Sequence, residues 1–205
     1  MTGQEIITMF EGLIDDTLDA DLELQLLNNA KDKIEGERDW EFLKKLDSSK
    51  SATSSAIDLP TDYVRTLNIF VDTTRYHQIP MEQKPVFVNS ALRWYLDSAN
   101  NHFYLLGSNP TGTVNHYYIY QTPDITTGTS PVWPAKFHKL LAFEMAELYF
   151  AIDQGERGFS WDDKFAVQKE LLRRSMIGWD AQLQRRANEN CMPQDYEAEY
   201  DLGSM

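Results

Sequence analysis

The chain has 205 residues, of which 42% are hydrophobic and 25% are charged, as in ordinary soluble globular proteins. No apolar run approaches the roughly 18 residues that a membrane-spanning helix needs, and the first residues lack the basic and apolar pattern of a signal peptide. The formal net charge of −13 opposes nucleic-acid binding except at a local basic patch.

Residues 1–46 are predicted to form the N-terminal helices of a bundle. The sequence "TGQE" is a capping-box pattern, with Thr2 and Glu5 three positions apart. A second helix is capped by Asp19 or Asp21 and ends at Gly36, and "DWEFLKKLD" adds at least two further helical turns. The apolar stripes comprise Ile6, Met9, Phe10, Leu13 and Ile14, then Leu22, Leu26, Leu27, Ala30 and Ile34, and finally Trp40, Phe42, Leu43 and Leu46.

The middle of the chain is predicted to be a β-rich insertion over residues 57–132, preceded by a serine-rich loop over residues 47–58. Alternation of apolar and other residues in "VRTLNIFVD" predicts a strand. "KPVFVNSALRWYLDS" fits a short helix better than a strand. The aromatic segments "HFYLL" and "VNHYYIYQT" flank the turn-forming "GSNPTGT" and predict a hairpin.

The C-terminal part is predicted to hold two long helices over residues 133–190, followed by an acidic tail over residues 191–205. The first helix runs from about Pro134 to Asp153, and "SWDD" caps the second. The apolar positions of the second helix are Phe165, Leu172, Met176, Trp179 and Leu183. The predicted fold class is therefore α+β, a helical bundle with long terminal helices and a small inserted β-sheet or hairpin region.

Charge is unevenly distributed along these elements. Residues 1–45 hold twelve acids against five bases, whereas residues 164–186 are predominantly basic, and the tail has no base. Such zones are consistent with attraction between copies of the chain, and equally with ordinary solvated helix faces.

No pattern of catalytic or metal-binding residues emerges, so we expect a protein without enzymatic activity, metal or cofactor. His138 and Glu144 are six positions apart and fall on different helix faces. Glu144 and Glu147 are three positions apart, but no histidine completes the E-x-x-H pattern of a helical metal site. His102 and His116 could face each other across the hairpin, but two histidines alone bind metals weakly. The only cysteine, Cys191, excludes an intrachain disulfide and fits assembly in a reducing cytoplasm.

Trp133 stands between Pro131 and Pro134, directly before the most hydrophobic helix. Proline fixes its own φ near −65° and disfavours helical geometry at the preceding residue, so the chain reaches the helix at one angle. Burial of the indole would hold this joint with about 1.5–3 kcal/mol or more. We expect Pro131, Trp133 and Pro134 to form a rigid joint, which a subunit of a closed ring needs and a stiff loop in a monomer also explains.

The order of these signals resembles the head-to-tail adaptor (connector) proteins of tailed bacteriophages. The resemblance rests on "DWEFL" before a serine-rich loop, "IDLPTDYVRTLNI", "FYLLG" with "YYIYQTP", and the Pro-Trp-Pro join in "PVWPAKFHKLLAFEMAELYFAID", and it covers roughly residues 1–180. It implies a structural virion protein of the neck, between capsid portal and tail.

The resemblance also implies partners and contact residues. Such adaptors usually form a twelvefold ring beneath the portal, extend the DNA channel without reading DNA sequence, and offer a platform to tail or nozzle proteins. The implied neighbour or tail contacts are Phe103, Tyr104, Tyr117 and Tyr120. The implied portal contacts are Trp179, Leu183, Arg185, Arg186, Met192, Tyr196 and Tyr200. A tail-completion or head-closure ring, or a protein-binding module unrelated to virions, are the alternative functions.

Overall fold

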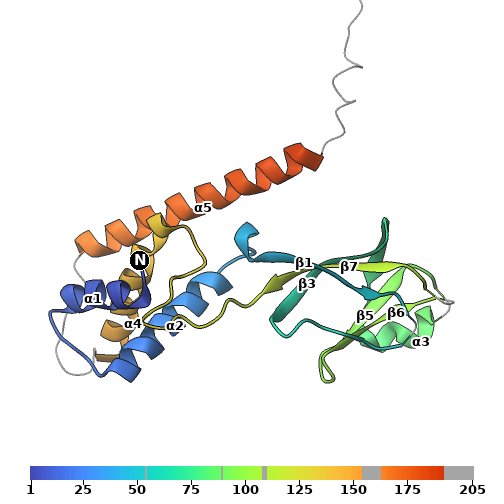
Figure 1. The fold of residues 1–205 in the computed structure, drawn as a ribbon, viewed down its shortest axis with the longest axis horizontal. Coiled ribbons are helices and arrows are strands. Elements are labelled where there is room, and N and C mark those ends of the chain that lie inside the picture. Colours follow the sequence, from blue (N-terminus) through green and yellow to red (C-terminus); the bar gives the residue numbers. More distant parts are fainter. Residues whose placement is uncertain (54, 89, 108–109, 154–162, 192–205) are drawn as a thin grey trace, which may run out of the picture. The chain divides into compact units, whose positions relative to one another are not determined.

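The computed structural model describes residues 1–53, 55–88, 90–107, 110–153 and 163–191. The chain forms two compact units (Figure 1). The first, here called the helical unit, contains Met1–Phe42 and the chain from Asp124 onward; the second, the sheet unit, contains Leu43–Pro123.

The helical unit begins with α1 (Gly3–Ile14) and α2 (Ala20–Gly36). The capping box at α1 is confirmed, because the Thr2 N–H donates to Glu5 Oε2 at 2.8 Å and the Glu5 N–H donates to Thr2 Oγ1 at 3.3 Å. Asp19 caps α2 by accepting from the Asp21 N–H at 3.0 Å. The predicted buried stripe of α2 holds except at its first position, since Leu22 is 40% exposed.

The core of the helical unit surrounds α4 (Lys139–Asp153), which follows the short 3-10 helix η3 (Ala135–Phe137). α4 packs against α1, α2 and α5 (Asp163–Cys191), and a helix with neighbours on three sides must be apolar nearly all round. Its first half is accordingly a run of buried residues, Leu140 to Ala146.

The sheet unit contains a seven-stranded sheet in the order β1-β7-β3-β4-β5-β6-β2. All neighbouring strands are antiparallel except β4 and β5, which are parallel and joined through η2 (Met81–Gln83) and α3 (Lys84–Phe87). The strands are β1 (Lys44–Ser51), β2 (Ile57–Asp58), β3 (Tyr63–Val71), β4 (Thr74–Gln78), β5 (Arg93–Asp97), β6 (His102–Leu106) and β7 (Thr113–Tyr120).

One buried cluster receives side chains from β2 to β7, including Ile57, Ile69, Trp94, Phe103 and Val114. Strands from almost the whole width of the sheet therefore surround the same core, so the sheet curls into a nearly closed, barrel-like form. The strand predicted from the alternation in "VRTLNIFVD" is confirmed as β3, with Ile69 and Val71 buried.

The predicted fold class, a helical bundle with a small hairpin, is wrong: the protein is a mixed α/β protein with a seven-stranded sheet. The predicted hairpin does not form, because β6 pairs with β5 and β2, whereas β7 pairs with β1 and β3. Within "KPVFVNSALRWYLDS" the helix is confined to Lys84–Phe87, and Arg93–Asp97 is a strand. Leu92, at φ 62°, lies in the left-handed region, where a helix cannot continue.

The helical turns predicted in "DWEFLKKLD" are also wrong, apart from the short η1 (Glu41–Leu43). Strand β1 starts at Lys44 and runs into the segment predicted as a serine-rich loop. No helix in the parts of the chain described above is long and apolar enough to cross a membrane.

Candidate functional site

The joint before α4 is a buried, hydrogen-bonded corner. Trp133 is 3% exposed, and its Nε1 donates to Glu35 Oε1 in α2 at 2.8 Å. The Trp133 carbonyl accepts from His138 Nε2 at 2.9 Å. Pro131 is also buried, and Pro134 is half-buried with an extended ψ of 134°. The helical turns therefore start after Pro134 rather than at it, and Trp133 joins the loop to both α2 and the start of α4.

Aromatic rings connect this joint to α5. The ring of Phe42 lies 6.3 Å from that of Trp133 and 5.8 Å from that of Trp179, measured between centroids. The ring of Phe137 lies 5.6 Å from that of Trp179. Trp179, one of the predicted portal contacts, is thus half-buried and packs inside the helical unit.

Next to Trp179, the fully buried Asp180 fixes α5 to the segment that follows α2 and leads into η1. Asp180 Oδ1 accepts from the Glu41 N–H at 2.6 Å, and Arg38 Nη2 lies 3.4 Å from Oδ2. Gln184 Nε2 also donates to Oδ2 at 3.2 Å. A buried carboxylate with several donors is strongly held, so this turn of α5 has a fixed position on the unit.

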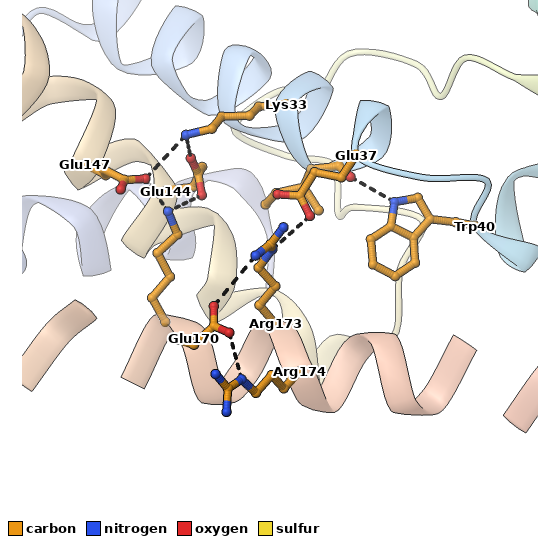
Figure 2. A network of polar contacts seen from close by, with 10 residues as sticks. Lys33, Glu37, Trp40, Glu144, Glu147, Glu170, Arg173 and Arg174 are labelled. Atoms are coloured by element: carbon orange, nitrogen blue, oxygen red, sulfur yellow. Dashed lines mark hydrogen bonds and ion pairs between the residues drawn. The ribbon is translucent and has the colours of Figure 1, made fainter. Parts of the chain in front are cut away.

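An ion-pair network joins α2, α4 and α5 (Figure 2). Lys169 Nζ lies 2.6 Å from Glu144 Oε2, Lys33 Nζ lies 3.3 Å from Glu147 Oε2, and the pairs Lys33–Glu144 and Lys169–Glu147 close the set. Burial alone would raise the pKa of Glu147, but Lys169 and Lys33 hold it below its ordinary value. Burial alone would lower the pKa of Lys33, but the ion pair with Glu144 favours the charged form, and the pKa of Lys33 is raised.

A second group of pairs continues along α5. Arg173 Nε lies 2.9 Å from Glu37 Oε2, and Arg174 Nε lies 2.7 Å from Glu170 Oε1 (Figure 2). The residues of both groups except Arg174 line an open cavity of about 380 Å³. Since the charged groups of both sets pair with one another, the arrangement clamps three helices together.

The residues considered for chemistry have structural surroundings. His138 is buried in the joint, and Glu144 and Glu147 are paired with lysines. His102 Nε2 lies 2.7 Å from Asp58 Oδ1, and His116 lies in the core of the sheet unit. Within the residues that the structure describes, no group of three or more His, Cys, Asp or Glu is placed to hold a metal ion.

The predicted contact residues of the sheet unit do not form one patch, since they lie on β6 and β7, which are not neighbours in the sheet. Phe103 is fully buried in the core, and Tyr104 is stacked on Tyr95 with ring centroids 4.9 Å apart. Tyr117 is 40% exposed. Tyr120 is half-buried, with Lys45 Nζ 3.9 Å from its ring centroid.

On α5, the predicted residues beyond Trp179 lie progressively nearer to solvent. Leu183 is half-buried, and Arg185 and Arg186 are exposed. Met192, Tyr196 and Tyr200 lie outside the described residues, as does the predicted "SWDD" cap except for its last residue.

Sequence reasoning missed two exposed aliphatic residues on α5. Val167 is 58% exposed and Leu171 is 60% exposed, four positions apart on the side opposite the buried Met176. The four-residue spacing of Val167 and Leu171 is visible in the sequence. It was overlooked because Phe165, Leu172, Met176 and Trp179 were sufficient to predict the helix and its buried side.

Comparison with known proteins assigns the chain to a family. No curated protein matches it. A family model described as SU10 adaptor protein matches residues 1–192. Because this match covers nearly the whole chain, the protein belongs to the SU10 adaptor family of phage head-to-tail adaptors, structural proteins of the virion neck that associate with portal and tail proteins.

Proposed function

We propose that copies of this chain close into a twelvefold ring beneath the portal, extend the DNA channel and provide the attachment platform for the tail. Family membership supports the adaptor role. The net charge of −13 fits a channel along which DNA passes without sequence-specific binding, because an acidic wall repels phosphates. Assembly takes place in the host cytoplasm.

The observation that carries the portal contact is the length of α5. The last buried side chain described on α5 is Asp180, yet the helix continues to Cys191. Short helical segments without packing partners are marginal in water. Arg185 and Arg186 are exposed on this segment, with no ion pair among the described residues. A partner surface would stabilise these turns.

The portal surface in this proposal comprises Trp179, Leu183, Arg185, Arg186, Met192, Tyr196 and Tyr200. Trp179 itself packs inside the helical unit, and its role in this proposal is to fix the position of α5 just before the part that runs from Asp180 to Cys191. In the sheet unit, Tyr104, Tyr117 and Tyr120 contact a neighbouring copy or a tail protein. Phe103 is left out, because it cannot reach a partner without opening the core.

The rigid joint suits a ring subunit. A small angular error that is repeated in every copy would prevent closure of the ring. Trp133 donates a hydrogen bond to Glu35 in α2 and accepts one from His138, and these two bonds restrict the angle at which the chain enters α4.

The proposal is tested by native mass measurement of the purified chain, of mass 23.7 kDa, alone and mixed with the portal. We expect a closed oligomer of twelve copies on the portal. A chain that stays solitary in the presence of portal would contradict the proposal, and preferential co-purification with tail-tube proteins would assign a tail-completion role instead.

The portal surface is tested by Arg185→Glu/Arg186→Glu. We expect portal association at least about tenfold weaker, equal to about 1.4 kcal/mol or more. Arg75→Glu/Lys139→Glu, at two exposed positions elsewhere, makes the same change in net charge and serves as the control. Equal portal association of both variants would remove the two arginines from the contact.

A further inference from the structure

The solvent-facing side of α5, here called the outer face, has an unusual composition. Nine residues between 165 and 186 are exposed, and they include three arginines and no acid. The arginines are Arg174, Arg185 and Arg186, and Val167 and Leu171 add exposed aliphatic groups. Of the acids of this segment, Asp180 is fully buried, and Glu170, whose side chain is 44% exposed, is paired with Arg174. The outer face is therefore basic with an apolar stripe.

A surface of opposite character lies where α1 ends and α2 begins, here called the acidic turn. Asp15, Asp16, Asp19 and Asp21 are all exposed around the exposed Leu22. No lysine or arginine occurs in the sequence before Lys31. None of the four aspartates has an ion pair within the described part of the chain.

The field at this turn is reflected in Glu23, which is 6% exposed at the start of α2. Burial raises the pKa of Glu23, opposed by a hydrogen bond from the Leu18 N–H, and Glu11 and Asp19 raise it further. Glu11 and Asp19 thus add like charge to a carboxyl whose pKa is raised mainly by burial.

The two surfaces belong to different sides of the helical unit. The outer face of α5 is opposite the side that packs on α4, and α4 also packs against α1 and α2 (Figure 1). A contact between two different surfaces of identical copies is heterologous, and heterologous contacts generate rings when the rotation closes.

We propose that the outer face of α5 in one copy binds the acidic turn of the next copy. This proposal rests on the proposed ring and names its subunit contact. Val167 and Leu171 supply apolar area opposite Leu22, and Arg174 faces the aspartates, whereas Arg185 and Arg186 remain with the portal surface. Complementary charge sets the register and accelerates association. Pairing of either surface with itself would oppose like charges, which disfavours two-fold dimers and favours head-to-tail addition.

The test uses two oppositely charged variants of the full chain. Variant one, Arg174→Glu/Gln182→Glu, introduces two acids into the outer face and lowers its charge from +3 to zero, without touching Arg185 or Arg186. Variant two, Asp16→Lys/Asp21→Lys, introduces two bases into the acidic turn and raises its charge from −4 to zero. The control, Arg75→Glu/Gln78→Glu, exchanges the same residue types at exposed positions of β4. Native mass is measured with and without portal, and far-ultraviolet circular dichroism verifies that each variant is folded.

We expect the unaltered chain and the control to assemble, and each variant alone to assemble at least about tenfold more weakly. An equimolar mixture of the two variants should regain assembly. Alternate contacts then pair the unaltered outer face of variant two with the unaltered acidic turn of variant one, and in the others the introduced glutamates face the introduced lysines. This rescue cannot arise from a general effect on folding.

The outcomes separate the subunit contact from the proposed function. If the unaltered chain fails to assemble even with portal, the proposed ring is wrong. If it assembles and either variant assembles equally well, or if the folded variants fail to rescue each other, the contact is overturned while the ring stands. Should a variant lose its helical signal, Leu171→Ser replaces it, because that side chain is 60% exposed, and unchanged assembly of this variant would overturn the contact.

Discussion

Trp133 joins three parts of the helical unit through one side chain and one carbonyl group. Its indole N–H reaches Glu35, its carbonyl accepts from His138, and its ring lies 6.3 Å from that of Phe42. The prolines restrict the backbone here, and these contacts select one of the conformations that remain.

Replacement Trp133→Phe should lower the free energy of unfolding of the helical unit by about 1–3 kcal/mol, because the buried Glu35 carboxylate loses a donor. Urea denaturation followed at 222 nm measures this, since the long helices belong to this unit. The control is Trp179→Phe, whose indole N–H has no partner within the described residues. Equal losses in both variants would mean that the bond to Glu35 contributes nothing.

His116 is a second residue whose surroundings make it sensitive. It is 1% exposed, its Nε2 lies 2.9 Å from Thr66 Oγ1, and it packs between Phe103 and Tyr118. Burial lowers the pKa of His116 to about 4, only partly opposed by Asp47.

The stability of the sheet unit should therefore depend on pH. The unfolded chain takes up this proton near pH 6.5 and the folded chain only near pH 4, so acid favours the unfolded state between these values. The free energy of unfolding contributed by neutral His116 is fully present above pH 6.5, and it falls by up to about 3 kcal/mol as the pH approaches 4. Urea denaturation between pH 4.5 and 7.5, followed by near-ultraviolet circular dichroism, measures the dependence.

Two histidine variants isolate this effect. His116→Phe should flatten the dependence of stability on pH, whereas His77→Gln, at an exposed position of β4, should leave it unchanged. An unchanged slope in His116→Phe would show that other groups cause it.

At the scale of elements, the start of α1 is held against the loop at residues 125–129. The Gly3 N–H donates to the Thr129 carbonyl at 2.7 Å, and the Gln4 N–H donates to the Thr127 carbonyl at 3.0 Å. A Cβ on Gly3 would overlap the Thr126 carbonyl oxygen, whereas a Cβ on Gly12 in the same helix would meet nothing within 4 Å.

These two glycines give a matched pair of variants. Gly12→Ala should stabilise the helical unit by about 0.5–1 kcal/mol, since alanine is the better helix former. Gly3→Ala should destabilise it by about 1–3 kcal/mol, because α1 must move away from its two hydrogen-bond acceptors. Thermal denaturation at 222 nm measures both. A stabilising Gly3→Ala would show that the contact is loose.

Elements whose signals are local could be predicted from the sequence. The capping pair of Thr2 and Glu5 spans three residues, and the helical spacing from Leu26 to Ile34 lies within one element. Because these signals are local, α1 and α2 could be predicted from the sequence. The exposed strand β1 buries no side chain, so it carries no apolar alternation, and its serines resemble a loop. Its stability comes from pairing with β7, about seventy residues away, which no local pattern encodes.

The same limit applies to the candidate surfaces. The prolines on either side of Trp133 indicate a stiff segment in the sequence, whereas the burial of its indole is seen only in the structure. Phe103 and Tyr117 look alike in the sequence, and only the pairing of their strands determines that one is in the core and the other at the surface. The acidic and basic zones were visible in the sequence, but not the burial of Asp180 or the pairing of Glu170 with Arg174.

At the scale of the whole molecule, the folded part and the C-terminal tail should be separable. The last buried side chain described is Asp180, so removal of the residues after Asn190 takes away no described packing.

A chain truncated after Asn190 should therefore keep its far-ultraviolet spectrum and lose less than about 0.5 kcal/mol of stability. It should nevertheless fail to join portal-containing heads, because it lacks Met192, Tyr196 and Tyr200. Co-sedimentation with heads measures this, with the full chain as reference. Truncated chains that sediment with heads as well as the full chain would exclude the tail from the portal contact.

The first and last strands of the sheet unit pair directly, with Lys44 opposite Ile119. The polypeptide thus leaves the helices after Phe42 and returns at Asp124 through two adjacent strands. Insertions whose ends lie together place little strain on their host and are readily exchanged. Evolution can accordingly lengthen, shorten or replace one continuous gene segment while the route of the backbone through the helices is preserved.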